Sequence, residues 1–152
     1  FIADDDTWVN VPRVLDIASQ YNDKIPIMMG FVLTANYRPY PFVWGGAGML
    51  LSGAAARILA SHLLTPSCPY LEFSDATISH CAYVHGVLHV HSPAFHWDKP
   101  VVPDQEGWEG TSRFPQTISE SVSFHYVTPE LMCSLTETVK PFWPPFRNRT
   151  VS

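Results

Sequence analysis

Three adjacent aspartates, Asp4, Asp5 and Asp6, directly follow the apolar residues 1–3. Neighbouring carboxylates repel one another, so a fold keeps three of them together only where water or a shared cation screens the charge. Hard cations such as Mg²⁺, Mn²⁺ and Ca²⁺ prefer oxygen ligands of this kind. In an extended segment Asp4 and Asp6 point the same way, because side chains alternate along a strand. Residues 1–3 are typical of the end of a buried strand, which predicts a ligand-binding loop at the carboxyl edge of a sheet.

The same aspartates have a second interpretation, an exposed acidic loop that precedes a helix. Asn10 is a suitable N-cap residue and Pro12 suits the first helical turn, so we expect a helix that begins near Val11. An EF-hand is excluded, because the glycine and the distal glutamate that it requires are absent. The residues alone leave the metal site and the exposed loop equally open.

Composition limits the classes of protein and of partner. The chain has 152 residues, of which 46% are hydrophobic and 15% charged, so we expect one globular domain with a real core. The net charge of −5 comes without a basic patch, which argues against a nucleic-acid partner. No apolar run approaches the roughly 18 residues that a membrane span requires. We expect the chain to be part of a longer protein, because it opens without a Met and with an apparent strand end.

Strand-like and helix-like patterns alternate, which predicts an α/β fold with part of its sheet upstream. Ser52 and Thr128 are expected helix caps, and Gly86 is an expected helix stop. The expected strands lie at 25–32, 87–90 and 122–126, and the expected helices begin near residues 11, 53, 75 and 129. Residues 100–115 are expected to form a surface loop. We assign 1–140 to the domain and 141–152 to a tail rich in proline and aromatic residues.

Gly45-Gly46-Ala47-Gly48 is a segment of small residues that would let the backbone approach a ligand closely. It matches neither a P-loop nor a dinucleotide fingerprint. A tight turn that leads into a helix explains it equally well. By itself the segment is a weak indication of a binding site.

Asp75 stands at the expected start of the third helix. Its simplest role is an N-cap, which is a common use of aspartate. Its alternative role is a general base, because the helix N-terminus favours the ionised carboxylate that a base must present.

Histidines cluster in the second half of the chain. His89 and His91 alternate along an expected strand and therefore share a face, and His96 follows beyond Pro93. A zinc hydrolase is one interpretation, although no HExxH signature is present. The other four histidines are interpreted as ordinary polar side chains: His62, His80, His85 and His125.

Four motifs in order resemble the fringe and core 1 β1,3-galactosyltransferase family. FIADDDTWV at residues 1–9 is similar to the family's acidic box, and GGAGMLLS at 45–52 to its glycine segment. DATIS at 75–79 is similar to a D-x-T-[IL]-G motif, and the stretch 86–96, which ends in Phe-His, to the fringe S-x-x-F-H stretch. Two departures stand out: Ser79 replaces the family glycine, and Ser74 stands where fringe proteins usually carry an acid.

The resemblance implies the C-terminal part of a GT-A fold, a mixed sheet with flanking helices, with the nucleotide-binding half upstream. It implies an inverting transfer of a hexose or N-acetylhexosamine, galactose or N-acetylglucosamine above all, from a UDP-sugar. The acceptor would be a hydroxyl of a glycan or glycoprotein, in a β1,3 linkage, and the cofactor Mn²⁺ or another divalent cation. The full-length protein would be a type II membrane protein of the Golgi or secretory-pathway lumen, with its anchor upstream.

The resemblance also implies residue roles. Metal ligation falls to Asp4, Asp6 and His96, and the role of base to Asp75. The donor would be held by Asp4, Asp5, Gly46, Ala47 and Gly48. Two alternatives stay open: a non-catalytic sugar-binding relative of the same fold, and an unrelated hydrolase built on the histidines.

Cysteine and sequon patterns fit a secretory lumen. Cys68 and Cys81 flank a short segment, and the core 1 enzymes carry a cysteine soon after their catalytic aspartate, so the resemblance implies a Cys68–Cys81 disulfide. Asn148 begins an Asn-Arg-Thr sequon and is a candidate glycosylation site.

Overall fold

The computed structural model describes residues 1–34, 38–100 and 118–142. The helices of this part are α1 (Val11–Ser19), η1 (Gly45–Ala47), α2 (Gly53–His62), α3 (Ser74–Val84), α4 (Pro129–Val139) and η2 (Lys140–Phe142), where η marks a 3₁₀ turn. Its strands are β1 (Trp8–Val9), β2 (Ile27–Gly30), β3 (Val32–Leu33), β4 (Phe42–Val43), β5 (Met49–Leu51), β6 (Leu88–His91), β7 (Phe95–His96) and β8 (Ser123–Phe124). Most of the expected loop at 100–115, most of the tail and Asn148 lie outside the described residues.

The described strands form mixed sheets, as the sequence predicts. In the central sheet, ordered β5-β2-β6, β2 is antiparallel to β5 and parallel to β6. In the second sheet, ordered β1-β8-β7, β8 is antiparallel to β1 and parallel to β7. A short antiparallel pair, β3-β4, completes the described sheets. The mixed α/β class is therefore confirmed.

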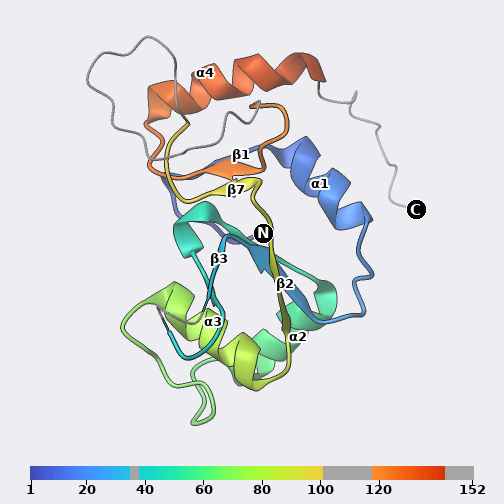
Figure 1. Ribbon diagram of the computed structural model, residues 1–152, viewed down its shortest axis with the longest axis vertical. Helices are drawn as coiled ribbons and strands as arrows, with labels where there is room; N and C mark the ends of the chain where they lie inside the picture. Colours follow the sequence, from blue (N-terminus) through green and yellow to red (C-terminus); the bar gives the residue numbers. More distant parts are fainter. Residues whose placement is uncertain (35–37, 101–117, 143–152) are drawn as a thin grey trace.

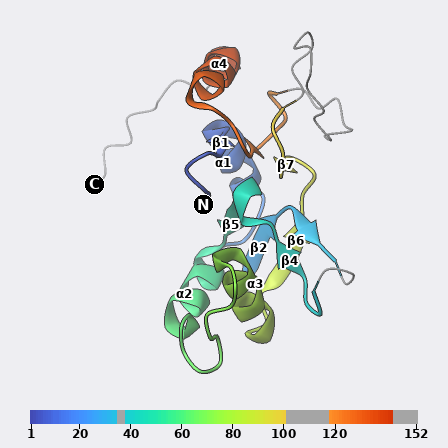
Figure 2. The same cartoon turned by 90° about the vertical axis from the view of Figure 1, so that its left-hand side faces the viewer.

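Helices flank both three-stranded sheets (Figures 1 and 2). Helices α2 and α3 lie together at one end of the molecule against the central sheet, and α4 lies at the other end over β1 and β8. On β2, Met28 packs in the cluster of α2 and α3, whereas Met29 packs with Val14 and Ile17 of α1. The central strand is thus buried on both faces. None of the helices in the described part is long and apolar enough to cross a bilayer.

Local chemistry sets the helix ends. The side chains of Asn10, Ser52 and Thr128 each accept a hydrogen bond from a backbone N–H three residues on, as capping residues do. Gly86 follows α3 with a positive φ of 72°, which glycine adopts without strain. These four positions agree with the sequence analysis.

Residues 1–3 differ from the expected end of a buried strand. Phe1 and Ile2 are 44% and 45% exposed, and Ile2 makes only an isolated antiparallel bridge to Met49. The segment reaches the central sheet at the edge strand β5 rather than within it. Residues 1–3 are therefore apolar, as in the sequence, but only partly buried, because they lie at the edge of the sheet.

Met28 is fully buried in the cluster between the central sheet and helices α2 and α3. Substitution of Met28 by Ala should lower the free energy of unfolding by about 2–5 kcal/mol, because it removes buried methylene and thioether groups and leaves a cavity. Urea unfolding followed by tryptophan fluorescence measures the change. The matched control is Leu15→Ala on α1, where Leu15 is 64% exposed, and it should change stability by less than about 0.5 kcal/mol. Equal effects of the two substitutions would contradict this placement of the core.

Candidate active site

The three aspartates form a tight turn rather than an extended segment. The Thr7 N–H donates to the Asp4 carbonyl at 3.2 Å, which closes the turn. The Asp6 carbonyl accepts from the Val127 N–H at 2.9 Å, and the Thr7 hydroxyl donates to the Gly46 carbonyl at 2.8 Å. The acidic turn is therefore held by the segment that follows β8, at Val127, and by η1, at Gly46.

His125 brings the two outer aspartates together. One ligand atom from each of Asp4, Asp6 and His125 lies within 4.8 Å of the others. The Nε2 atom of His125 is 3.3 Å from Oδ1 of Asp6 and 3.8 Å from Oδ2 of Asp4. The histidine is buried, while the Asp4 and Asp6 side chains are 59% and 43% exposed. The group therefore faces solvent on its carboxylate side and protein on its imidazole side.

The other ring nitrogen of His125 lies 3.3 Å from the carbonyl oxygen of Trp97. A carbonyl can only accept, so Nδ1 is the donor in this hydrogen bond, and Nε2 is the ring nitrogen that faces the aspartates. A backbone carbonyl that accepts from the other ring nitrogen in this way is usual behind metal-binding histidines. The His125 ring also stacks on Tyr126, with ring centroids 3.7 Å apart.

The site needs small residues in the glycine segment for two different contacts. A Cβ on Gly46 would lie 2.1 Å from Cε1 of His125, and a Cβ on Gly45 would lie 2.8 Å from Cβ of Asp75. Gly48 has a φ of +86°. Glycine at 45 and 46 therefore makes room for Asp75 and His125.

Gly46, Ala47 and Gly48, the residues expected to line the donor pocket, are buried. The Gly46 carbonyl accepts from Thr7, and the Ala47 carbonyl accepts from the Ser123 hydroxyl. Through these hydrogen bonds the glycine segment is attached to the acidic turn and to β8. Their assignment to the donor stays a prediction, as does that of Asp5, which is exposed and outside the group of three.

His96, the expected third metal ligand, lies elsewhere. Its Nε2 atom is 3.0 Å from the Ser121 hydroxyl, and its ring stacks on Phe124 with centroids 4.6 Å apart. In the parallel pairing of β7 with β8, His96 is in register with Phe124, so both point to the face covered by α4. His125 follows Phe124 and points to the opposite face. The geometry thus favours His125 over His96 as the third candidate ligand. Sequence analysis did not identify His125 as a ligand, although Ser121, Ser123 and His125 alternate with apolar residues and so mark one face of an expected strand.

Asp75 lies in the first turn of α3, not at its cap. The cap position is Phe73, whose side chain makes no capping hydrogen bond. The carboxylate of Asp75 accepts hydrogen bonds from the N–H of the next residue, Ala76, at 2.8 Å and from the N–H of Gly45 at 3.1 Å. Each carboxylate oxygen keeps a lone pair for a further hydrogen bond. The expectation of simple N-capping is therefore wrong.

Asp75 and Asp4 share one cavity of about 310 Å³. We call it the acidic hollow, and its lining residues are Asp4, Gly45, Tyr70, Glu72, Phe73, Ser74 and Asp75. A carboxylate of the three-residue group and the expected base therefore face the same space, although they come from different parts of the chain.

The structure pairs Cys68 with Cys81 in a disulfide, with 5.1 Å between their Cα atoms, as the resemblance implied. His85 lies close enough to both sulfurs to complete a second potential metal group. Sulfurs joined in a disulfide are not thiolates, however, and only thiolates bind metal strongly. Among the described residues this leaves Asp4, Asp6 and His125 as the group suited to a metal.

His89 and His91 do not join His96 in any group of potential metal ligands among the described residues. The Nδ1 atom of His89 is 3.0 Å from the Val87 carbonyl, and the Nδ1 atom of His91 accepts from the Val32 N–H at 3.1 Å. Burial, the largest influence, lowers the pKa of His89. The arrangement gives no support to a hydrolase built on these three histidines.

Comparison with known proteins places the chain. The model of the Fringe-like family matches residues 1–131. The chain belongs to this family. A beta-1,3-glucosyltransferase of Mus musculus is 32% identical over 105 residues, which cover 66% of this chain and 21% of that protein.

Two further relatives are similar to the chain. A glycoprotein-N-acetylgalactosamine 3-beta-galactosyltransferase 1 of Xenopus laevis is 28% identical over 166 residues, covering 89% of this chain and 43% of that protein. The human beta-1,3-glucosyltransferase is 30% identical over 105 residues, covering 66% of this chain and 20% of that protein. The Fringe-like chain thus spans less than half of the length of each of these relatives.

The contact between Gly46 and His125 can be tested through metal binding. Substitution of Gly46 by Ala should push the His125 ring away from Asp4 and Asp6. Since these three residues are the predicted Mn²⁺ ligands, the substitution should weaken the predicted Mn²⁺ binding by about 10–100-fold, the usual effect of disturbing the residues behind metal ligands. Isothermal titration of the full-length protein with Mn²⁺ measures the affinity. The control is Gly53→Ala, because a Cβ there meets nothing closer than 3.4 Å. Unchanged affinity in the Gly46 variant would contradict the role of this contact.

Proposed function

We propose that this chain is the catalytic segment of an inverting, metal-dependent β1,3-glycosyltransferase that uses a UDP-sugar donor. The observation that carries the proposal is the convergence on one space of a cation-binding group and a separate carboxylate. Asp4 belongs to the group with Asp6 and His125, and it lines the acidic hollow together with Asp75. Membership of the Fringe-like family and the activities for which the relatives are named support it.

The donor set suits a divalent cation such as Mn²⁺. Two exposed carboxylates offer hard oxygen ligands, and the His125 imidazole offers Nε2 while its Nδ1 is hydrogen-bonded to the Trp97 carbonyl. Asp4, Asp6 and His125 would hold the ion. When bound, the cation supplies positive charge for the diphosphate leaving group of the donor.

Asp75 would act as the general base. A hydroxyl of the acceptor approaches the carboxylate in the acidic hollow, and its proton passes to a free lone pair of that carboxylate. The hydroxyl oxygen forms a bond to the anomeric carbon of the donor sugar. The bond from that carbon to the diphosphate oxygen breaks on the opposite side, and its electron pair leaves with UDP. This single displacement inverts the anomeric configuration.

The two hydrogen bonds that Asp75 accepts from Gly45 and Ala76 fix the direction of its carboxylate. A fixed carboxylate brings the reacting hydroxyl to one position, which lowers the entropy cost of reaching the transition state. Because Gly45 belongs to the same short turn as Gly46, the base and the cation-binding group are positioned by neighbouring residues.

We further propose that the chain is the C-terminal part of a GT-A fold whose nucleotide-binding half lies upstream. The donor sugar is a hexose or N-acetylhexosamine, and the acceptor a glycan or glycoprotein. The relatives named as glucosyl- and galactosyltransferases support this class of donor. The Cys68–Cys81 disulfide supports a secretory-pathway lumen, where disulfides persist. A membrane anchor upstream and glycosylation of Asn148 belong to the same proposal.

The test is transfer from UDP-[³H]galactose, UDP-[³H]glucose and UDP-[³H]N-acetylglucosamine by the full-length protein with Mn²⁺. Asp75→Asn should lower kcat by about 10²–10⁴-fold, the usual contribution of a general base, with little change in Mn²⁺ affinity. Asp6→Asn and His125→Gln should weaken Mn²⁺ binding, and excess Mn²⁺ should restore part of their activity. A stable protein that binds sugar but transfers none would point instead to a non-catalytic relative.

Two comparisons sharpen the result. Asp16→Asn removes an exposed carboxylate from α1, where it pairs with Arg13, and it should leave transfer unchanged. His96→Gln should keep Mn²⁺ affinity close to that of the unmodified protein, whereas His125→Gln should not. If the His96 variant alone loses the metal, the ligand set proposed from the geometry is incorrect.

A further inference from the structure

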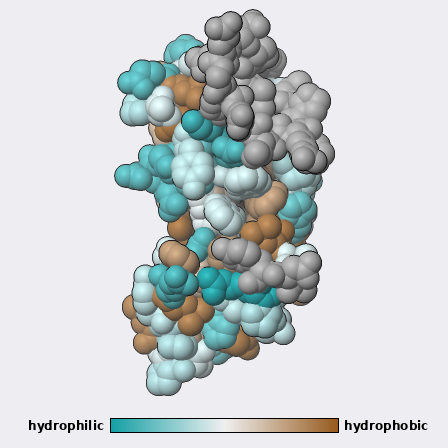
Figure 3. All heavy atoms as spheres, turned by 60° about the vertical axis from the view of Figure 1, so that its left-hand side comes forward, coloured by the Kyte–Doolittle hydropathy of each residue, from teal (hydrophilic) through white to brown (hydrophobic). Residues whose placement is uncertain are grey.

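One wall of the acidic hollow is made by the connecting segment, residues 63–73, which joins α2 to α3. Two residues of this segment that line the hollow, Tyr70 and Phe73, have large aromatic side chains and are strongly exposed, at 66% and 53%. Apolar and polar residues alternate over the end of the molecule formed by α2 and α3 (Figure 3). Single exposed apolar residues are common on protein surfaces, but two exposed aromatic residues beside the carboxylate of Asp75 indicate a binding surface.

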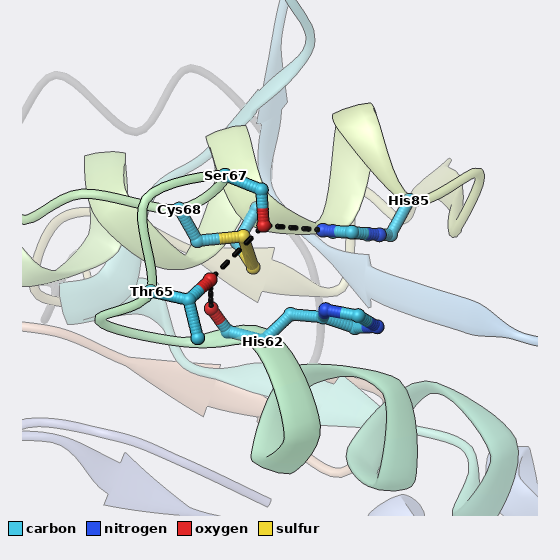
Figure 4. Close-up of a disulfide and its surroundings, with 6 residues drawn as sticks. His62, Thr65, Ser67, Cys68 and His85 are labelled. Carbon is cyan, nitrogen blue, oxygen red and sulfur yellow. Dashed lines mark hydrogen bonds between the residues drawn. A yellow bond between two sulfur atoms is a disulfide. The ribbon is translucent and has the colours of Figure 1, made fainter.

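The backbone of the connecting segment is anchored to α3. Cys68 is fully buried and is joined to Cys81 of α3 (Figure 4). Buried Thr77 of α3 accepts a hydrogen bond from the Leu71 N–H at 2.9 Å, and its hydroxyl donates to the Phe73 carbonyl at 2.9 Å. These attachments lie on both sides of Tyr70 and directly at Phe73. A ligand that stacks on the rings would thus meet a wall that is already ordered.

Polar groups complete the wall. The Glu72 side chain, 72% exposed, lies between the two aromatic residues in sequence, and its carboxylate is 4.0 Å from the Arg38 guanidinium. Asp75 lies three residues further on and lines the same hollow. Rings with carboxylates at their edges match a pyranose, which has C–H groups on its faces and hydroxyls around its rim. The carboxylates also make the wall acidic, which disfavours an anionic sugar.

We propose that Tyr70 and Phe73 form the platform on which the acceptor's pyranose ring stacks, and that the acceptor is an uncharged hexoside. Glu72 accepts hydrogen bonds from hydroxyls of this ring, and Asp75 receives the proton of the hydroxyl that attacks the donor. The proposal rests on the glycosyltransferase function and adds to it the residues that select the acceptor. The disulfide and Thr77 act as positioning elements for the platform.

The experiment uses the full-length protein, Mn²⁺, the donor that it accepts, and nitrophenyl glycosides of galactose, N-acetylgalactosamine, N-acetylglucosamine and fucose as acceptors. Tyr70→Ala and Phe73→Ala should each raise the acceptor KM about three- to tenfold, the range expected for loss of one aromatic contact. The donor KM and the slow hydrolysis of donor without acceptor should not change. Tyr70→Phe, which keeps the ring, should retain the acceptor KM within about twofold.

The matched control is Tyr83→Ala, because Tyr83 is 51% exposed on the same helix as Asp75 but does not line the hollow. Thr77 does not line the hollow, but Thr77→Val should still raise the acceptor KM, because it removes both hydrogen bonds between Thr77 and the connecting segment. Nitrophenyl glucuronide should be a poor acceptor, and Glu72→Gln should improve it relative to the neutral glycosides. Thermal unfolding of each variant shows that the fold is retained.

The outcomes separate the two proposals. If the unmodified protein transfers sugar but Tyr70→Ala and Phe73→Ala keep its acceptor KM, the platform is overturned and the glycosyltransferase function stands. If the unmodified protein neither transfers nor hydrolyses any UDP-sugar, the function fails and the platform fails with it. A preference for the glucuronide over the neutral glycosides would overturn the acceptor class alone.

Discussion

The contact between the His125 ring and the backbone of Gly46 is the constraint on which the site depends. A Cβ at position 46 would lie within 2.4 Å of three ring atoms, so no side chain fits between them. This contact places the end of β8 against η1. The acidic turn is hydrogen-bonded to η1 through Thr7 and to Val127, just beyond β8, through Asp6. Three segments far apart in sequence meet at one histidine.

The parts of the fold that follow from short-range chemistry could be predicted from the sequence. The caps at Asn10, Ser52 and Thr128 depend on a side chain and a backbone N–H three residues away, so the local residues contain the whole interaction. Gly86 ends α3 for an equally local reason. The acidic box and the glycine segment were also recognisable, because each is a continuous run of unusual residues.

The parts that failed depend on pairing between distant segments. His125 rather than His96 meets the aspartates because β8 lies in one particular register between β1 and β7. A shift of one residue would exchange the faces of every side chain on so short a strand. The sequence shows that Ser121, Ser123 and His125 alternate, but not which face of their strand meets Gly46. Of the two roles considered for Asp75, N-capping is the one that the structure contradicts, because its carboxylate accepts a long-range hydrogen bond from Gly45 and the cap position is Phe73.

Ser79 shows how the chain accommodates a departure from the family pattern. Its side chain is fully buried, and its hydroxyl accepts from the Val43 N–H at 3.0 Å. A buried hydroxyl is tolerated only where it finds such a partner. The hydrogen bond joins α3 to β4, the strand that leads directly into Trp44 and Gly45. Ser79 therefore ties the helix that carries Asp75 to the segment that donates to Asp75.

The two residues Gly45 and Gly46 consequently contact both parts of the candidate site, Asp75 and the Asp4–Asp6–His125 group. Gly45 donates to Asp75, the expected base, and Gly46 accepts from Thr7 and contacts His125 of the Asp4–Asp6–His125 group. Since both residues belong to one short 3₁₀ turn, a displacement of the turn moves Asp75 and the Asp4–Asp6–His125 group together. An enzyme that holds a donor on one side and activates an acceptor on the other needs a fixed distance between the two. Because one turn contacts both Asp75 and His125, it sets the distance between them directly.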